Sequence, residues 1–258
     1  MKNLKLGRLT LGLTVLASTL LAVPQTTDPT SATASGVWER VLQAKGGRDR
    51  LHGVLNLLRV QPRPKEPTRP ILVELLVFPD KDWVWADQRG SVLGLRLNVR
   101  SETGLWMVFG GKRGQPDRFA WFPPDKQAEK NRLVTVHESL LLESRWLQAR
   151  PLKLSKGRIG KEDFDVVVVD FEADPYQSEY YIDRRTSLVR RITRRGIPTD
   201  FEDYKAVDGI MMPSRETLGL KSKVTTISEY AFNVEYDPDI FKRKPSIEDG
   251  PDAWKLRK

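Results

Sequence analysis

The sequence predicts a mainly β (α+β) protein, built on a single curved antiparallel sheet that forms an unclosed half-barrel with helices covering its mouth. Apolar and polar residues alternate with a period of two in many successive segments, whereas helical spacing occurs in only two. Because no helix alternates with each strand, the pattern argues against a parallel βαβ sheet. One helix cannot fill the concave face of such a sheet, and half-barrels of this kind commonly hold a lipid-sized cavity.

The N-terminus has the parts of a secretory signal peptide. A short basic region precedes a mostly apolar run over residues 9–23, which is short for a membrane span of about 20 apolar residues. We expect cleavage after Ala22, with Ala34 as a second possible site. An uncleaved N-terminal anchor is the alternative interpretation.

The chain therefore divides into three parts. The segment after the apolar run is rich in Thr, Ser, Ala and Pro, which predicts a disordered leader. The parts are a signal peptide at 1–22, a disordered leader at 23–35 and one domain at 36–258. The last part, of about 225 residues, is long enough for one sizeable all-β domain.

The composition excludes several classes of protein. The chain has no cysteine, so it has no disulfide, no thiolate metal site and no cysteine nucleophile. The formal net charge is +9, and removal of Lys2, Lys5 and Arg8 with the signal peptide leaves +6. This excess favours anionic partners such as phospholipid headgroups, while export argues against nucleic acid.

The first half of the domain predicts one helix and several strands. Residues 36–45 have an apolar helical face, and Gly46-Gly47 ends the helix. A short strand at 57–61 and a proline-rich loop follow. Alternation then predicts strands at 71–78, 83–85, 92–100 and 105–109. In 92–100 the polar positions are Gly94, Arg96, Asn98 and Arg100, which predicts a half-buried strand with one solvated face.

The second half contains a second helix and further strands. An irregular stretch begins at Trp121, and residues 132–147 return to helical spacing. Strands resume from Gly160 and are predicted at 166–169, 180–183, 188–193, 200–204, 210–217 and 223–232. Residues 184–187 form a hairpin, and Asp208-Gly209 is the strongest turn signal.

No catalytic constellation is recognisable. His137-Glu138 begins like a zinc-protease helix, but Leu141 stands where the second metal-binding histidine must be. Nucleophile, phosphate-loop and dinucleotide motifs do not occur. The carboxylates near one strand are spaced for solvated turns rather than for a paired acid and base; they are Asp163, Asp165, Asp170 and Glu172. We therefore expect no enzyme, no cofactor and no metal site.

Apolar strand positions are the first candidates for a binding site. In an antiparallel sheet one face is normally core, so each of these residues is also explained without a ligand. The alternative is that they line a lipid cavity. The candidates are Ile71, Val73, Leu75, Val77, Trp83, Trp85, Leu93, Leu95, Leu97, Val99 and Trp106.

An arginine cluster is the second candidate. Arg184, Arg185, Arg190, Arg191, Arg194 and Arg195 lie within twelve residues. A solvated hairpin edge that discourages aggregation explains them. The functional alternative is contact with anionic headgroups or an acidic partner through Arg190, Arg191, Arg194 and Arg195. Adjacent arginines on a strand point to opposite faces, so at most half are expected to act together.

Several segments resemble a known family. A helix that ends in Gly46-Gly47 opens many bacterial exported proteins. The later segments are Tyr181-Ile182-Asp183 with Thr186 and Leu188, Phe201-Glu202-Asp203-Tyr204, residues 207–213 and residues 233–241. In this order the chain resembles the outer-membrane lipoprotein-sorting superfamily, the LolA/LolB-like half-barrels.

The resemblance implies an unclosed barrel whose cavity takes acyl chains or other lipids, with residues 36–45 and 132–147 as lid helices. No motif aligns with the lid-holding arginine of the true carrier, and the proline-rich loop and residues 121–147 depart from a minimal carrier. We expect a monomeric periplasmic carrier of lipid or acylated lipoprotein, involved in outer-membrane lipoprotein sorting or lipid transfer. The alternative is a periplasmic sensor or scaffold that binds an envelope protein through the basic hairpin. An exported hydrolase is a third hypothesis.

Overall fold

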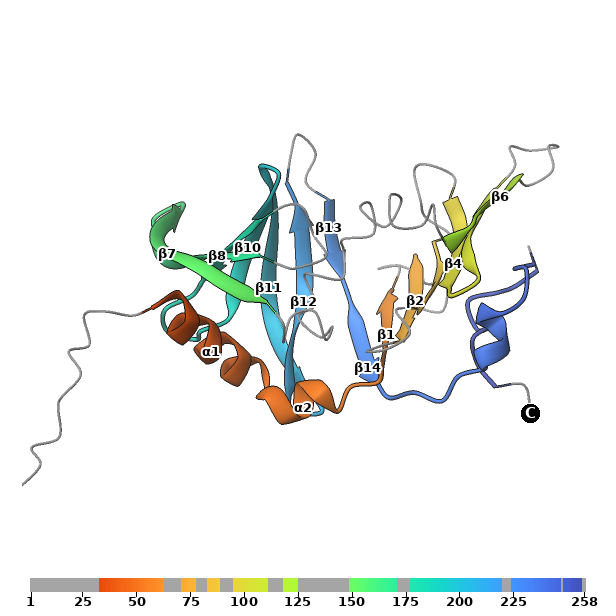
Figure 1. The fold of residues 1–258 in the computed structure, drawn as a ribbon, viewed down its shortest axis with the longest axis horizontal. Helices are drawn as coiled ribbons and strands as arrows, with labels where there is room; N and C mark the ends of the chain where they lie inside the picture. Colours follow the sequence, from red (N-terminus) through yellow and green to blue (C-terminus); the bar gives the residue numbers. More distant parts are fainter. Residues whose placement is uncertain are drawn as a thin grey trace, which may run out of the picture. The chain divides into compact units, whose positions relative to one another are not determined.

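The computed structural model describes most of the expected domain (Figure 1). The described residues are 33–62, 71–77, 83–88, 95–110, 118–124, 149–170, 177–219, 224–246 and 248–256. The expected signal peptide, all but the end of the expected leader, and the helix predicted at 132–147 lie outside them.

Two helices open the domain, α1 (Ala34–Lys45) and α2 (Arg48–His52). Thr33 caps α1, because its hydroxyl accepts a hydrogen bond from a backbone N–H of the first turn at 3.1 Å. Gly46 and Gly47 end α1 with φ values of 144° and 85°. Their N–H groups donate to carbonyls of the last turn, as in other glycine-terminated helices. The first predicted helix is confirmed.

The strands form two antiparallel seven-stranded sheets. The first sheet has the order β14-β1-β2-β3-β4-β5-β6 and the second the order β13-β12-β11-β10-β9-β8-β7. The first comprises β1 (Asn56–Gln61), β2 (Leu72–Val77), β3 (Trp83–Asp87), β4 (Leu95–Ser101), β5 (Gly104–Phe109), β6 (Arg118–Phe122) and β14 (Glu229–Phe232). The second comprises β7 (Arg150–Ile159), β8 (Glu162–Asp170), β9 (Ser178–Ile182), β10 (Val189–Arg194), β11 (Ile197–Val207), β12 (Ile210–Leu218) and β13 (Val224–Ile227). A 3-10 helix, η2 (Pro238–Phe241), follows β14.

One segment belongs to both sheets. β13 pairs with β12 and β14 pairs with β1, and the two strands follow each other in the chain (Figure 1). Only Ser228 lies between them in the sequence. Ser228 is buried, and its N–H donates to the carbonyl of Ser214 at 3.0 Å. The strand predicted over 223–232 therefore changes its partner at Ser228. Through this shared strand the two sheets form one series of neighbouring strands that begins at β7 and ends at β6. Within the described residues, β7 and β6 are not paired with each other.

The predicted fold class is confirmed. The protein is mainly β and antiparallel, and it is not closed into a barrel. The single predicted sheet consists of two ladders that meet at Ser228. Trp121 and Phe122, which were expected to begin an irregular stretch, are instead the end of β6, and β7 was not predicted. Within the described part of the chain, no helix has both the length and the apolar character needed to span a membrane.

Both faces of the first sheet contribute residues to a core. We call inner the face that shares a core with α1 and the second sheet, and to that core the first sheet contributes Leu57, Leu76, Val84 and Ala86. The outer face packs against the C-terminal segment, residues 233–256, in a second core. The prediction of a solvated face at 92–100 is wrong, because Asn98 and Arg100 share the inner face with Ala86 and Val84 and are only 8% and 5% exposed.

Candidate functional site

The inner core joins α1 to both sheets. Val37, Trp38, Val41 and Leu42 of α1 are buried there, and Trp38 meets Tyr180 of β9 edge-on with ring centroids 5.1 Å apart. α1 packs mainly on β7, β8 and β12, which all belong to the second sheet. The apolar side chains of α1 therefore occupy part of the surface that forms the inner core.

The last residue of α1 is a wholly buried lysine. Lys45 is 0% exposed, and its ammonium group contacts the thioether of Met212 at 3.4 Å and lies 5.7 Å from the centre of the Tyr204 ring. A thioether is a weak acceptor, so this contact compensates the lost hydration poorly. Burial lowers the pKa of Lys45 to about 7, although Glu216 acts to raise it.

A second buried cation lies where the two sheets meet. Arg59 of β1 donates to Glu216 of β12 at 3.0 Å and, through its Nε, to the Ser228 hydroxyl at 3.0 Å. Glu74 of β2 is 3.9 Å from the other guanidinium nitrogen. Arg59, Glu74 and Glu216 are 2%, 5% and 7% exposed. This cluster fastens the first sheet to the second beside the residue at which the shared strand changes partner.

Some polar atoms of this cluster have no hydrogen-bond partner. One terminal nitrogen of Arg59 and one carboxylate oxygen of Glu74 are buried without a hydrogen bond. Burial raises the pKa of Glu74, while Arg59 acts to lower it. Tyr230 donates from its hydroxyl to the Pro213 carbonyl at 2.8 Å and to Glu216 at 3.3 Å. The inner core is thus partly polar, with paired charges beside an apolar surface.

The predicted lipid-lining residues lie mainly on the outer face. The structure brings eight of them together there, in the core or packed against it: Val73, Leu75, Val77, Trp83, Trp85, Leu97, Val99 and Trp106. They meet Ile240 and Phe241 of η2 and Trp254. Ile71 precedes β2 and is half-buried, Leu95 belongs to β4 without a described side chain, and Leu93 lies outside the described residues. The C-terminal segment of the chain therefore covers this face. That these residues line a lipid cavity stays a prediction.

The predicted headgroup arginines already have carboxylate partners. Arg191 of β10 binds Asp200 at 2.6 and 3.0 Å, and Arg190 pairs with Glu202. Asp200 and Glu202 flank buried Phe201, so both guanidinium groups lie on one face. A bulge between Val189 and Arg191 permits this, and it corrects the expectation of opposite faces.

The other two predicted arginines lie at the end of the same hairpin. Arg194 is the last residue of β10, and Arg195 follows in the turn with φ 51°. Both take part in further interactions. Contact of this hairpin with headgroups or with an envelope protein stays a prediction.

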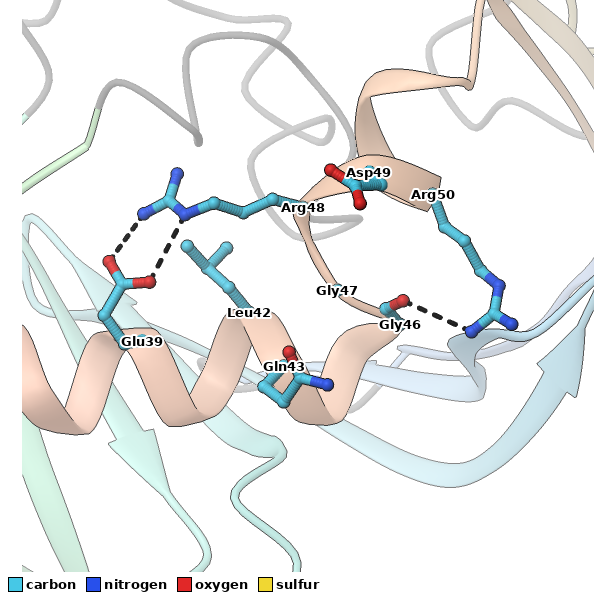
Figure 2. Close-up of a pocket in the computed structure, with 8 residues that line it drawn as sticks. All are labelled: Glu39, Leu42, Gln43, Gly46, Gly47, Arg48, Asp49 and Arg50. Carbon is cyan, nitrogen blue, oxygen red and sulfur yellow. Dashed lines mark hydrogen bonds and ion pairs between the residues drawn. The ribbon is translucent and has the colours of Figure 1, made fainter.

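Charged side chains line both of the pockets that the structure describes. The larger, of about 500 Å³, lies at the turn between α1 and α2 (Figure 2). Its lining is Glu39, Leu42, Gln43, Gly46, Gly47, Arg48, Asp49 and Arg50. Arg48 reaches back to Glu39 with two hydrogen bonds of 3.2 and 2.5 Å. The second, of about 340 Å³, lies beside the arginine hairpin. Neither lining suits an acyl chain. Among the described residues, no cluster of side chains could hold a metal ion.

Sequence reasoning missed the buried charges. Lys45 precedes Gly46-Gly47, where a cation normally sits in solvent and complements the helix dipole. Arg59 stands between Leu58 and Val60 in a short strand, and this apolar context was the available signal. Glu216 has polar neighbours and gave no signal.

Comparisons with known proteins find similarity among solved structures only. No family model matches the chain, and no curated protein matches it. A LolA superfamily protein from Nitrosomonas europaea is similar at 11% identity and a TM-score of 0.44, with 83% of this chain and 99% of that one covered. A DUF1329 family protein from Desulfovibrio piger is similar at 8% identity and a TM-score of 0.42, with 82% of this chain and 98% of that one covered. A LolA superfamily protein is thus among the structures to which this chain is similar, as the sequence resemblance predicted.

Proposed function

We propose that the protein is an exported periplasmic carrier that binds lipid or lipoprotein acyl chains between its sheets, where α1 acts as a displaceable lid. The observation that carries the proposal is the position of α1: its apolar side chains occupy the inner surface of an unclosed antiparallel structure. An acyl chain offers that surface the same apolar contact as the helix does. The basic and apolar N-terminal segment supports export.

The energetics of α1 suit a lid. Burial of Val37, Trp38, Val41 and Leu42 contributes about 6–12 kcal/mol of transfer free energy at about 1.5–3 kcal/mol for each side chain. Burial of Lys45 offsets about 4 kcal/mol of this at neutral pH. Gly46 and Gly47 follow immediately, with positive φ values that glycine adopts more readily than other residues. The helix is therefore held firmly enough to close the apolar surface and weakly enough to be exchanged for a ligand.

Cross-linking of α1 tests the proposal on a chain without native cysteines. Arg40 of α1 and Asp165 of β8 approach to 4.0 Å, so Arg40→Cys with Asp165→Cys can be joined by a short bismaleimide. The matched control joins Arg158→Cys to Asp163→Cys across the β7–β8 hairpin, where the native side chains are 2.9 Å apart. The readout is native mass spectrometry with lipid extraction, before and after incubation of delipidated protein with phospholipid.

We expect wild type and the hairpin control to hold and take up lipid, and the cross-linked α1 variant to take up none. The same α1 variant without the linker should behave as wild type. Equal uptake with α1 cross-linked would refute the lid. A wild-type protein that purifies free of lipid and takes up none would refute the carrier function altogether.

A further inference from the structure

The apolar outer face of the first sheet extends beyond the segment that covers it. η2 contacts β3 and β4, and the residues that it covers are buried. At the β5–β6 end the same face continues with Trp106, Phe119 and Trp121, as the pairings of Trp106 with Trp121 and of Val108 with Phe119 require. There Phe119 is 41% and Trp121 48% exposed, and Trp106 is half-buried. Three aromatic side chains therefore stand at the open end of a face that is otherwise core.

These aromatic side chains are held in place. The rings of Trp106 and Trp121 are 6.1 Å apart. Gly104 leaves room for the Trp121 indole, because a β-carbon there would lie 2.9 Å from the indole nitrogen. The exposed ammonium group of Lys244 lies 4.6 Å from the Phe119 ring centre and 5.8 Å from that of Trp106. We call Trp106, Phe119, Trp121 and Lys244 the aromatic edge, which belongs to the terminal strand of its sheet and to the residues beside it.

The composition of the aromatic edge suits a membrane surface better than solvent. Tryptophan and other aromatic rings prefer the headgroup level of a bilayer, where an apolar body and a polar atom are both accommodated. A lysine beside them adds attraction to anionic lipid of about 1 kcal/mol. The positive formal charge, +9 for the whole chain and +6 without the expected signal peptide, acts in the same direction. The arginine hairpin differs, because Arg190 and Arg191 are engaged by Glu202 and Asp200.

We propose that the aromatic edge on β5 and β6 docks the protein onto an anionic phospholipid bilayer. The lipid-facing contact is made by Phe119 and Trp121, and Lys244 meets the headgroups. This inference goes beyond the proposed carrier function and does not rest on it, because docking is measured on the vesicle surface and lipid uptake inside the protein.

The test is co-sedimentation of the purified chain with vesicles of phosphatidylethanolamine and phosphatidylglycerol. The variant is Phe119→Ser with Trp121→Ser. The matched control is Leu152→Ser with Leu218→Ser, which removes two apolar side chains of 51% and 52% exposure from the second sheet. Circular dichroism and thermal unfolding confirm that both variants fold.

We expect the aromatic-edge variant to lose roughly ten- to hundred-fold in partitioning to vesicles. The control and Arg190→Gln with Arg191→Gln should change by less than about two-fold. Lys244→Gln should weaken binding to anionic vesicles about five-fold and leave binding to phosphatidylcholine vesicles unchanged.

Three outcomes would overturn the inference. One is equal loss in the aromatic-edge variant and in the Leu152 and Leu218 control. Another is the absence of vesicle binding by wild type. The third is a dimer, seen by light scattering, that Phe119→Ser with Trp121→Ser dissociates, since the edge would then be occupied by a second copy of the chain. A protein that binds vesicles but takes up no lipid would overturn the carrier function and leave the docking surface standing.

Discussion

The two faces of the first sheet are buried by different kinds of residue. The outer face is almost entirely apolar, with Asp87 as its buried acidic residue, and a segment from the C-terminus covers it. The inner face combines Leu57, Leu76 and Val84 with the buried charges of Arg59 and Glu74. Apolar burial alone stabilises the outer face. On the inner face, the cost of desolvating the buried charges offsets part of the stabilisation from apolar burial. Buried charges with perturbed pKa values are typical of functional sites.

The difference separates the face that the C-terminal segment covers from the face that is proposed to bind lipid. The residues with the most regular apolar alternation, which the sequence marked as a lipid surface, hold the C-terminal segment. The less regular face holds the helix proposed to move.

Removal of the buried arginine has the largest expected effect. Arg59→Met leaves Glu74 and Glu216 buried without their cation, and we expect a loss of about 3–5 kcal/mol in unfolding free energy by urea denaturation at neutral pH. The same substitution combined with Glu74→Gln and Glu216→Gln should recover most of the loss. A loss below about 1 kcal/mol from Arg59→Met alone would mean that the inner charges are not a structural cluster.

A matched pair of leucines compares the two faces directly. Leu75 on the outer face and Leu57 on the inner face are both 0% exposed, so Leu→Ala at either should cost about 2–5 kcal/mol in urea denaturation. Their effect on bound lipid should differ. Lipid extraction from folded protein should give a wild-type content for Leu75→Ala and a reduced content for Leu57→Ala. The opposite result would restore the outer face as the lipid surface.

The buried lysine predicts a dependence of stability on pH. Below pH 7 both folded and unfolded Lys45 are protonated, and the stability does not depend on this group. Between pH 7 and the unfolded value of 10.5 only the unfolded state holds the proton, so stability rises with pH. Urea denaturation from pH 7 to 9 should show a gain of about 2 kcal/mol that is absent in Lys45→Met. A Lys45→Met profile that rises as steeply as wild type would assign the gain to other groups.

An ion pair at the surface gives the smallest effect. Arg191 and Asp200 are 25% and 23% exposed in their side chains, so Arg191→Ala should cost less than about 1 kcal/mol and the loss should shrink in high salt. Thermal unfolding at two salt concentrations measures this. A loss of stability as large as that of Arg59→Met would show that solvent exposure does not decide how much an arginine ion pair contributes to stability.

Much of the fold follows from local signals in the sequence. Gly46-Gly47 marks the end of α1, and Asp208-Gly209 forms the predicted turn with φ values of 49° and 78° between paired Val207 and Ile210. β7 escaped prediction because it is an exposed edge strand, with Pro151 and a bulge that interrupt its alternation. β6 escaped because its five residues run directly into Pro123 and Pro124.

The candidate site was less predictable than the fold. Alternation identifies two faces of a strand but not the distant segment that covers each face. Here η2, at Pro238–Phe241, covers residues more than a hundred positions earlier in the chain. The ion pair of Arg59 with Glu216 spans 157 positions and joins two sheets. Only the tertiary arrangement brings these groups together, so sequence spacing could not find them.

The shared strand at Ser228 also bears on how the chain folds. β1 near the start of the domain has β14 as its second partner, and the bonds from Asn233 to Leu55 and Gly53 span 178 and 180 positions. A chain that becomes available from its N-terminus onward cannot form the pairing of β1 with β14 until nearly all of its residues are available. β1 then presents an unpaired edge for most of synthesis, which invites pairing with other chains. Contacts of such high sequence separation also slow folding, so this protein should fold slowly for its size and depend on being kept apart from its neighbours until the last strand arrives.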